Sequence, residues 1–410
     1  MNIYHKWVYP KPVMDMRAAI ASGQYLEIGD PSFYWPLMWP SKRGLDVNLN
    51  ILCAGCGSNQ AAYYACQHPT WNVVGIDVSG SSLAHQQFLK DKHGLSNLEL
   101  IEMDLSRIGE LEKQFDFITC TGVLHHLDAP DEGLRALAGA LHPDGVMNLM
   151  VYGKSLRMGI YPLQEAFRLM RMDQSQEDVD LIKTVLQSLP QDHAIQRYIH
   201  HANDLNFDAG LVDTFLNPVD RAYSVKEIFE FTRRSGLEFL SWCEPAEYSL
   251  QAQIPPHHPV WRKLNDLSSE DAAHVCDLLL QSRGTHRWLV AHPEYVSRNR
   301  IPFGEDALFD CSVRLTPGCV LDVAATPTAP GSIPYVRGNL RVEMPKDLSN
   351  LMQQMDGKRS IRSVLSNIDT VANGMGTFKR EIARELKALY DMGHIQIFLH
   401  DLNEFNFSKG

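Results

Sequence analysis

The chain has 410 residues, with 38 Lys and Arg against 49 Asp and Glu, so its formal net charge is −11. At about 150 residues per domain this length predicts two or three domains, and 44% hydrophobic with 21% charged residues argues against a disordered or fibrous protein. The acidic balance also argues against a nucleic-acid backbone as the main partner, so we expect a small molecule or a protein instead.

The eight cysteines lack the repeated C-x-x-C spacing of a structural zinc site, so we expect free thiols in a reducing compartment. The first thirty residues contain no apolar stretch of the signal-peptide type, and no run approaches the ~20 apolar residues of a membrane span. These features predict a cytoplasmic protein without a membrane partner.

Residues 1–49 form the first predicted segment, a helical and aromatic lid. Its stretch 31–40, PSFYWPLMWP, is unusually rich in aromatic residues. Aromatic faces attract cations and exclude water, which suits a ligand pocket, but the same rings also serve as ordinary core that covers a sheet edge. Both interpretations remain open from the sequence.

Residues 50–153 alternate short β-rich runs with helical stretches, which predicts a parallel sheet covered by helices. Such sheets bind ligands at the carboxyl ends of their strands. The expected strands are residues 50–54, 71–77, 98–103, 115–119 and 146–151.

The pattern after residue 153 predicts one sheet domain with two insertions. Residues 154–221 read as a helical insertion that forms a substrate lid, and residues 222–295 complete the sheet around a second insertion, 244–284. Within 222–295 we expect an amphipathic helix that ends at Gly236 and strands at 237–242 and 286–293, the last of them closing with Pro293.

Residues 296–410 begin with turn-rich, Pro- and Gly-punctuated sequence and continue with three amphipathic helices and a final strand. This pattern predicts a small winged-helix-like α+β module. Residues 341–410 hold ten Lys or Arg against nine Asp or Glu, which is not the basic stripe of a nucleic-acid reader. We therefore expect the module to bind a peptide or to form a homodimer.

One sequence motif predicts a ligand-binding site. The strand at 51–54 leads directly into Gly55-Cys56-Gly57, where glycines let a ligand approach the backbone at the start of a helix. Asp77 ends the next strand twenty residues after Gly57, where a carboxylate accepts hydrogen bonds from both hydroxyls of a ribose. This spacing leaves two classes of nucleoside ligand, dinucleotides and S-adenosylmethionine.

Together, ILCAGCG, VVGIDVS, MDL at 103–105, FDFITCTGVLHHLDAP and LHPDGVMNLMVY resemble the ordered motifs of class I S-adenosylmethionine-dependent methyltransferases, in a bacterial group with AGCG and GVLHHL motifs. The resemblance implies a Rossmann-like α/β fold and S-adenosylmethionine as cofactor. It departs from the family at Cys53, where an acidic residue is usual, and at Asn59, where a third glycine is usual. The cofactor-binding residues that it implies are Ala54, Gly55, Cys56, Gly57, Asp77, Val78, Asp104, Leu105, Thr121 and Gly122.

Possible catalytic residues lie after the fourth and fifth strands, namely His125, His126, Tyr152, Arg157 and Tyr161. Adjacent histidines are expected to point to different sides of the backbone, and at least one of them to be structural. Arg157 suits an anionic substrate group through its planar fork. Asp213 and Arg221 are further candidates for the pocket wall. Each of these residues also has a purely structural interpretation.

No D-x-x-x-D-type cluster follows the fourth strand, so we expect no metal. The leading hypothesis is direct in-line transfer of a methyl group to an S, N or O nucleophile of a small molecule. One alternative is a protein methyltransferase whose C-terminal module captures a polypeptide. Another is a non-catalytic regulator that senses S-adenosylmethionine.

Overall fold

The computed structural model describes residues 7–41, 48–254, 258–264, 266–327, 330–338, 340–366 and 375–399. The chain divides into two compact units, of which the first comprises residues 1–33, 48–239 and 277–293. The second comprises residues 34–47, 240–276 and 294–410. The C-terminal boundary thus lies at 294, close to the predicted 296, whereas residues 34–47 and 240–276 belong with the C-terminal residues rather than with the sheet domain.

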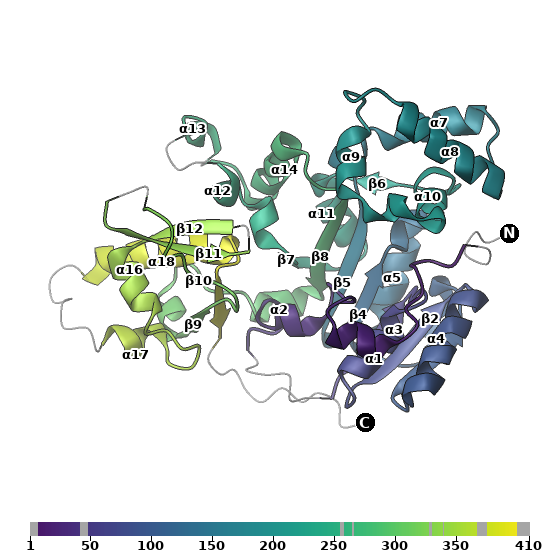
Figure 1. Ribbon diagram of the computed structural model, residues 1–410. Helices are drawn as coiled ribbons and strands as arrows, with labels where there is room; N and C mark the ends of the chain where they lie inside the picture. Colours follow the sequence, from purple (N-terminus) through teal and green to yellow (C-terminus); the bar gives the residue numbers. More distant parts are fainter. Residues whose placement is uncertain are drawn as a thin grey trace. The chain divides into compact units, whose positions relative to one another are not determined.

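Within the described residues, eight strands form one sheet in the order β3-β2-β1-β4-β5-β8-β7, with β6 paired to β5 (Figure 1). Strands β1 to β5 are parallel to their neighbours, and β8 is antiparallel to β5. The strand order reverses between β1 and β4, which is where open α/β sheets bind ligands. The strands are β1 Asn50–Ala54, β2 Asn72–Asp77, β3 Leu98–Glu102, β4 Phe115–Thr121, β5 Leu141–Gly153, β6 Ala222–Tyr223, β7 Glu238–Trp242 and β8 Thr285–Ala291.

This topology confirms the predicted Rossmann-like α/β fold, and every strand predicted within 50–153 is present. Helices follow β1, β2 and β4, as the βαβ pattern requires. They are α3 Gln60–Gln67, α4 Gly80–His93 and α5 Pro130–Ala140. The predicted amphipathic helix is α11 Val225–Arg234, which begins with a capping box between Ser224 and Glu227 and ends before Gly236, whose φ is 74°.

The insertion 154–221 is helical, as predicted, and has its own apolar core. Its helices are α6 Lys154–Arg157, α7 Ile160–Leu169, α8 Gln176–Ser188, α9 Gln196–His201 and α10 Asp208–Phe215. Buried Ile160, Phe167, Ile182 and Phe215 belong to one cluster that joins these helices. Because this core holds the insertion together, its polar residues are presented at defined positions beside the sheet.

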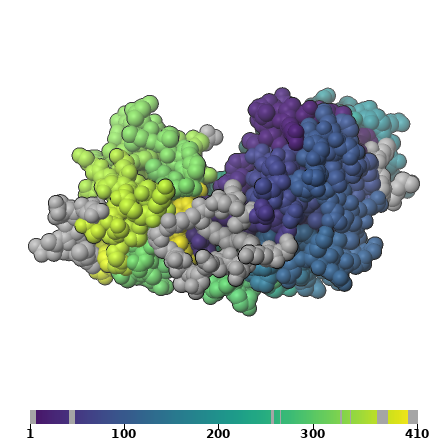
Figure 2. Space-filling model, turned by 90° about the horizontal axis from the view of Figure 1, so that it is seen from below, coloured from purple at the N-terminus to yellow at the C-terminus, as the bar shows by residue number. Residues whose placement is uncertain are grey.

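Residues before the sheet pack against helices α3 and α4. The short helix α1 Met16–Ala21 begins where the Met16 N–H donates to Nε2 of His93, 3.1 Å away at the end of α4. Lys92 Nζ donates to the carbonyl oxygen of Met14 at 2.8 Å. Figure 2 shows the purple N-terminal residues directly beside the blue residues of the following α/β elements.

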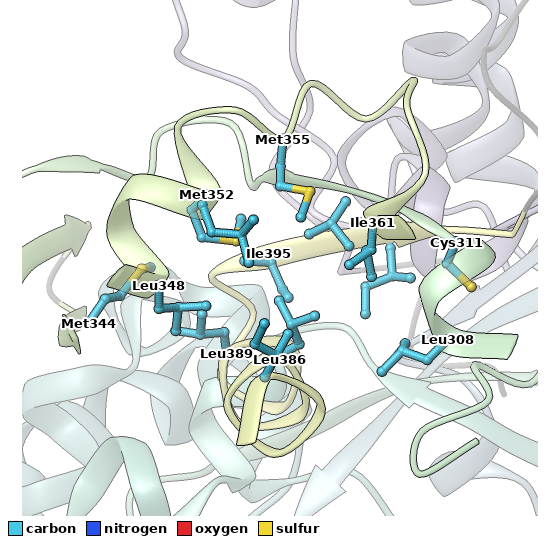
Figure 3. Close-up of a cluster of buried hydrophobic side chains, with 14 of the residues drawn as sticks. Leu308, Cys311, Met344, Leu348, Met352, Met355, Ile361, Leu386, Leu389 and Ile395 are labelled. Carbon is cyan, nitrogen blue, oxygen red and sulfur yellow. The ribbon is translucent and has the colours of Figure 1, made fainter. Parts of the chain in front are cut away.

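The second unit contains a separate core of apolar side chains, drawn in Figure 3 around Met352, Ile361, Leu386 and Ile395. Two antiparallel sheets, β10-β11-β12 and β13-β9, are present among its described residues. Its strands are β9 Ser312–Leu315, β10 Val320–Leu321, β11 Ser332–Arg337, β12 Leu340–Pro345 and β13 Ile395–Phe398. Its helices include α12 Leu250–Gln253, α13 Trp261–Leu264, α16 Lys346–Met352, α17 Ile361–Leu365 and α18 Met375–Asp391. The division between the units falls within α2 Pro31–Met38, α14 Ser269–Leu280 and α15 Pro293–Arg298.

The three C-terminal helices and the last strand were predicted, whereas strands β9 to β12 were not. Pro334 and the positive-φ residues Gly331 and Gly338 interrupt the alternation that would have indicated β11 and β12. The winged-helix likeness stays a prediction. None of the described helices combines the length and the apolarity that a membrane span requires.

Candidate functional site

A cavity of about 490 Å³ lies in the first unit at the carboxyl ends of β1, β2 and β4. This volume falls in the range of about 300–1,000 Å³ that is typical of small-molecule sites. Nine of the ten predicted cofactor-binding residues line it: Gly55, Cys56, Gly57, Asp77, Val78, Asp104, Leu105, Thr121 and Gly122. The tenth, Ala54, is the fully buried last residue of β1 and does not line the cavity.

The loop after β1 needs its two glycines for both conformation and space. Gly55 and Gly57 have φ values of 73° and 53°, in the left-handed region that side chains disfavour. A β-carbon at Gly55 would lie 2.2 Å from Cγ2 of Val123, and one at Gly57 would lie 2.9 Å from Cδ of Pro10. Any side chain at these two positions would therefore collide with Val123 or Pro10, which pack against the loop.

Asp77 joins this loop to the end of β2. One carboxylate oxygen, Oδ2, accepts the N–H of Gly57 at 2.8 Å, and Oδ1 accepts the N–H of Ser79 at 2.8 Å. Burial raises the pKa of Asp77, while these N–H donors act in the opposite direction. Each oxygen keeps a lone pair for a further donor, so the residue fits a ligand with two adjacent hydroxyls.

Asn59 replaces the third glycine of the family pattern, and the structure gives it a clear role. Its Nδ2 donates to the carbonyl oxygen of Lys11 at 2.9 Å, and its Oδ1 accepts the N–H of Val13 at 2.9 Å. Ser58 Oγ donates to the carbonyl oxygen of Pro10 at 2.7 Å. These bonds fasten the N-terminal segment across the loop, so that Tyr9 and Pro10 become part of the cavity wall.

The thiols near the cavity are structural. All eight cysteines of the chain are free. Cys53, Cys56 and Cys120 are buried, and burial raises the pKa of Cys120 to about 12 and the pKa values of Cys53 and Cys56 well above their ordinary value. None of them is a thiolate at neutral pH, so none is a nucleophile.

His126 and Tyr152 line the cavity and share a partner, Asp213. Nδ1 of His126 lies 2.7 Å from the carbonyl oxygen of Val219 and 3.0 Å from Nδ2 of Asn217. Nε2 of His126 faces Oδ1 of Asp213 at 3.5 Å. The Tyr152 hydroxyl donates to Oδ2 of the same carboxylate at 2.5 Å. Asp213 is 3% exposed and also lines the cavity, as the sequence suggested.

Arg157 does not reach the cavity, contrary to the predicted contact with an acceptor. Its side chain is fully buried, where Nη2 pairs with Oδ2 of Asp220 at 2.7 Å and Nη1 donates to the Tyr198 hydroxyl at 3.1 Å. The guanidinium lies 3.6 Å from the ring centre of Tyr152. Helix α6 begins directly after β5, and Arg157 at its end packs against the ring of Tyr152 and does not point into the cavity.

His125, Tyr161 and Arg221 are also absent from the cavity wall. The two histidine rings lie side by side with centres 4.1 Å apart, yet only His126 lines the cavity. His125 is fully buried without a hydrogen-bond partner on either ring nitrogen, and burial, then the charges of His126 and Arg157, lower its pKa well below the ordinary value. Tyr161 lies near Arg157, and Arg221 packs on the ring of Tyr223.

The cavity also contains residues that the sequence did not indicate. Asp204, Asn217, Pro218 and Val219 come from the helical insertion, which supports its interpretation as a substrate lid, and Tyr9, Tyr25, Glu27, Gln60 and Arg287 come from other segments. Gln60 lies only three residues after Gly57 and could have been proposed from that position, whereas the others lie far from the motif in the sequence and left no local signal.

The aromatic stretch 31–40 does not contribute to the cavity. Tyr34, Trp35 and Trp39 are 5%, 5% and 1% exposed, so they are core residues of the second unit. The described part of the insertion 244–284 does not line the cavity either. In the described parts of the chain, no three His, Cys, Asp or Glu side chains are grouped to hold a metal ion.

Comparison with known proteins relates the chain to one family. Residues 52–147 match the family model described as a methyltransferase domain. An uncharacterized protein of Synechococcus sp. is 30% identical over 228 residues, which are 52% of this chain and 55% of that protein. A tRNA U34 carboxymethyltransferase of Desulfotalea psychrophila is 31% identical over 103 residues, which are 24% of this chain and 32% of that protein. The chain thus spans about half of the first relative and about a third of the second.

Among solved structures, PKMT2 from Rickettsia typhi in complex with AdoHcy aligns with 90% of this chain and 76% of its own, with a TM-score of 0.58 and 15% sequence identity. At this identity the likeness shows a shared fold, which extends over both units of the chain.

Proposed function

We propose that this protein, whose residues 52–147 form a class I S-adenosylmethionine-dependent methyltransferase domain, transfers a methyl group from S-adenosylmethionine to an amine of a small molecule. The observation that carries the proposal is the cavity that unites the glycine loop, Asp77, Asp104 and Thr121. When bound, S-adenosylmethionine supplies an electrophilic methyl group on a sulfonium sulfur.

The residues of the cavity fit this cofactor. Asp77 retains acceptor capacity for the ribose hydroxyls, and Gly55 and Gly57 line the cavity beside it. Oδ1 of Asp104 accepts from the N–H and the hydroxyl of Ser106 at 2.9 and 2.6 Å, which leaves Oδ2 for the adenine amino group. Leu105 supplies apolar contact for the base.

The lid side of the cavity favours a cationic acceptor. Asp204 and Asp213 line it together with the rings of Tyr9 and Tyr152. Burial, and then the charge of Asp213, raises the pKa of Asp204, so a bound cation would relieve an existing repulsion. Aromatic faces add to the attraction for an ammonium group. These features favour nitrogen among the S, N and O nucleophiles that the sequence left open.

His126 is the group best placed to remove the acceptor's proton. A protonated amine has no lone pair, so it must lose a proton before its nitrogen bonds to the methyl carbon. The His126 ring lines the cavity, and Asp213, whose Oδ1 lies 3.5 Å from Nε2, would stabilise the imidazolium that forms. The carbon–sulfur bonding pair stays on sulfur when that bond breaks.

The test is an assay with methyl-labelled S-adenosylmethionine and a cell lysate separated by molecular size. We expect the label on nitrogen in the small-molecule fraction, with formation of S-adenosylhomocysteine, and we expect His126→Asn to lower kcat by about 10²-fold. S-adenosylhomocysteine formation equal to that without enzyme, with every fraction unlabelled, would contradict the proposal and favour the sensing regulator.

A polypeptide acceptor is the second candidate. The residues that line the cavity all belong to the first unit, while the second unit has its own core and is thus available for another partner. Label in the protein fraction of the same assay would favour this candidate over the small-molecule amine.

A further inference from the structure

We propose that Glu27, Gln60 and Arg287 bind the amino-acid end of S-adenosylmethionine and so replace the acidic residue that β1 lacks at Cys53. This inference rests on the proposed function. All three side chains line the cavity, and two of them, Glu27 and Arg287, lie outside the methyltransferase-domain match at 52–147.

Glu27 is held in place by the segment around it. The neighbouring Asp30 accepts a hydrogen bond from Nε2 of His68 at 2.8 Å, and its side chain is fully buried. At Gly29 a β-carbon would lie 2.0 Å from Nδ2 of Asn148, so the backbone at Gly29 packs in direct contact with a side chain of strand β5. The Asp30 N–H donates to the carbonyl oxygen of Glu27 at 2.9 Å. Glu27 is therefore a fixed feature of the cavity.

The carboxylate of Glu27 lies near the position where the family usually has its acid. Glu27 lines the same cavity as Gly55 and Cys56, the two residues that follow Cys53 and Ala54 after β1. Burial also raises the pKa of Glu27, while the guanidinium of Arg287 and the amide of Gln60 act in the opposite direction. The acidic function has thus moved from the strand to a segment that precedes the sheet.

Gln60 and Arg287 each present a buried polar atom without a hydrogen-bond partner, Oε1 of Gln60 and Nη1 of Arg287. Gln60 is 6% exposed, and its Nε2 donates to Oγ1 of Thr121 at 3.1 Å, which holds the amide between the glycine loop and the end of β4. Arg287 stands opposite Met150, another cavity residue, in the β5–β8 pairing. Unpaired buried polar atoms are rare because they are costly, so they point to a ligand.

The side chains of Glu27, Gln60 and Arg287 complement the two opposite charges of an amino-acid group. An α-ammonium group donates hydrogen bonds, and Glu27 and Oε1 of Gln60 accept them. An α-carboxylate accepts hydrogen bonds, and Nη1 of Arg287 donates one with its charge. Gln60 also contacts Thr121, which the family resemblance assigns to the methionine side of the cofactor. This agreement favours the amino-acid end of S-adenosylmethionine over an amino-acid group on the acceptor.

The test compares two ligands by calorimetric titration: S-adenosylhomocysteine, and 5′-methylthioadenosine, which lacks the amino-acid end. We expect Glu27→Gln and Arg287→Met to weaken binding of the first at least 30-fold and to change binding of the second less than twofold. Asp77→Asn should weaken both ligands, and Glu102→Gln, an exposed carboxylate on the adjacent strand β3, should weaken neither. Arg287→Lys should restore part of the loss by keeping the charge.

Each other outcome has a definite meaning. If the wild-type protein binds neither ligand, the proposed function itself fails. If wild-type binding is normal and both variants bind S-adenosylhomocysteine as the wild type does, the inference is wrong and these residues serve another group. If Glu27→Gln weakens the two ligands equally, Glu27 acts through the fold, which also overturns the inference. Thermal melting of each variant identifies any that fail to fold.

Discussion

The buried ion pair of Arg157 and Asp220 allows a quantitative test of how the helical insertion 154–221 is stabilised. Their side chains are 0% and 2% exposed, and the pair supports the ring of Tyr152 from behind. Arg157→Met keeps much of the volume and leaves Asp220 buried without its positive partner. Removing one member of a buried pair costs about 3–5 kcal/mol, because the remaining charge is desolvated and uncompensated.

The double variant Arg157→Met/Asp220→Asn removes both charges and should recover a large part of that loss. The Gln164 amide donates to Asp220 at 2.6 Å, and the substituted side chain still offers it a carbonyl oxygen as acceptor. The assay is urea unfolding followed by circular dichroism, with all four proteins of the cycle measured at one pH and salt concentration.

An exposed ion pair with the same separation serves as a control for the effect of burial on the free energy of unfolding. Arg107 and Glu110 are also 2.7 Å apart, but their side chains are 60% and 54% exposed. Arg107→Met should leave the free energy of unfolding unchanged within error, since water screens such a pair. The reasoning is refuted if Arg157→Met costs less than about 1 kcal/mol or if the double variant is no more stable than the single one.

Three further predictions concern the cavity and its supports. Asp77→Asn should weaken binding of S-adenosylhomocysteine at least ~100-fold, about 2.8 kcal/mol, and unchanged affinity in a titration would remove Asp77 from the site. Because burial and Asp213 raise the pKa of Asp204, that carboxyl takes up a proton as the pH falls while ordinary carboxyls are still charged; KM for an amine should therefore rise on acidification, and Asp204→Asn should flatten that KM–pH profile. Burial alone would raise the pKa of Asp30, but hydrogen bonds from His68 and Ser32 hold that pKa below its ordinary value of 3.8. The ionised Asp30 carboxylate therefore stabilises the fold fully above pH 3.8, and this stabilisation is lost as the pH falls through the lower pKa of the folded state. Asp30→Asn should thus reduce stability at pH 7 and weaken its acid dependence, and identical unfolding curves from pH 2 to 7 would contradict this.

The sequence by itself was sufficient for the sheet and for the part of the cavity wall formed by the glycine loop and Asp77. The strand pattern at 50–54 and 72–77 is local, and the carboxyl ends of adjacent parallel strands must meet at one edge, so Gly55, Gly57 and Asp77 were bound to converge. The helix before Gly236 was equally local, since its cap and its terminating glycine lie within a few residues of it.

Only the tertiary structure decided the other end of the site. Arg157 pairs with Asp220 and does not face an acceptor, because the turn from β5 into α6 and the packing of the inserted helices direct its side chain there. Neither the turn nor the packing produces a periodic pattern in the sequence. Glu27 and Arg287 are 260 residues apart (287 − 27) and meet because one precedes the sheet and the other lies on its antiparallel strand. Local sequence patterns indicate which face of a helix or strand is buried, but the residues that pack against that face are set by distant elements. For this reason Glu27, the carboxylate that we propose in place of the acidic residue absent at Cys53, could be identified only from the folded chain.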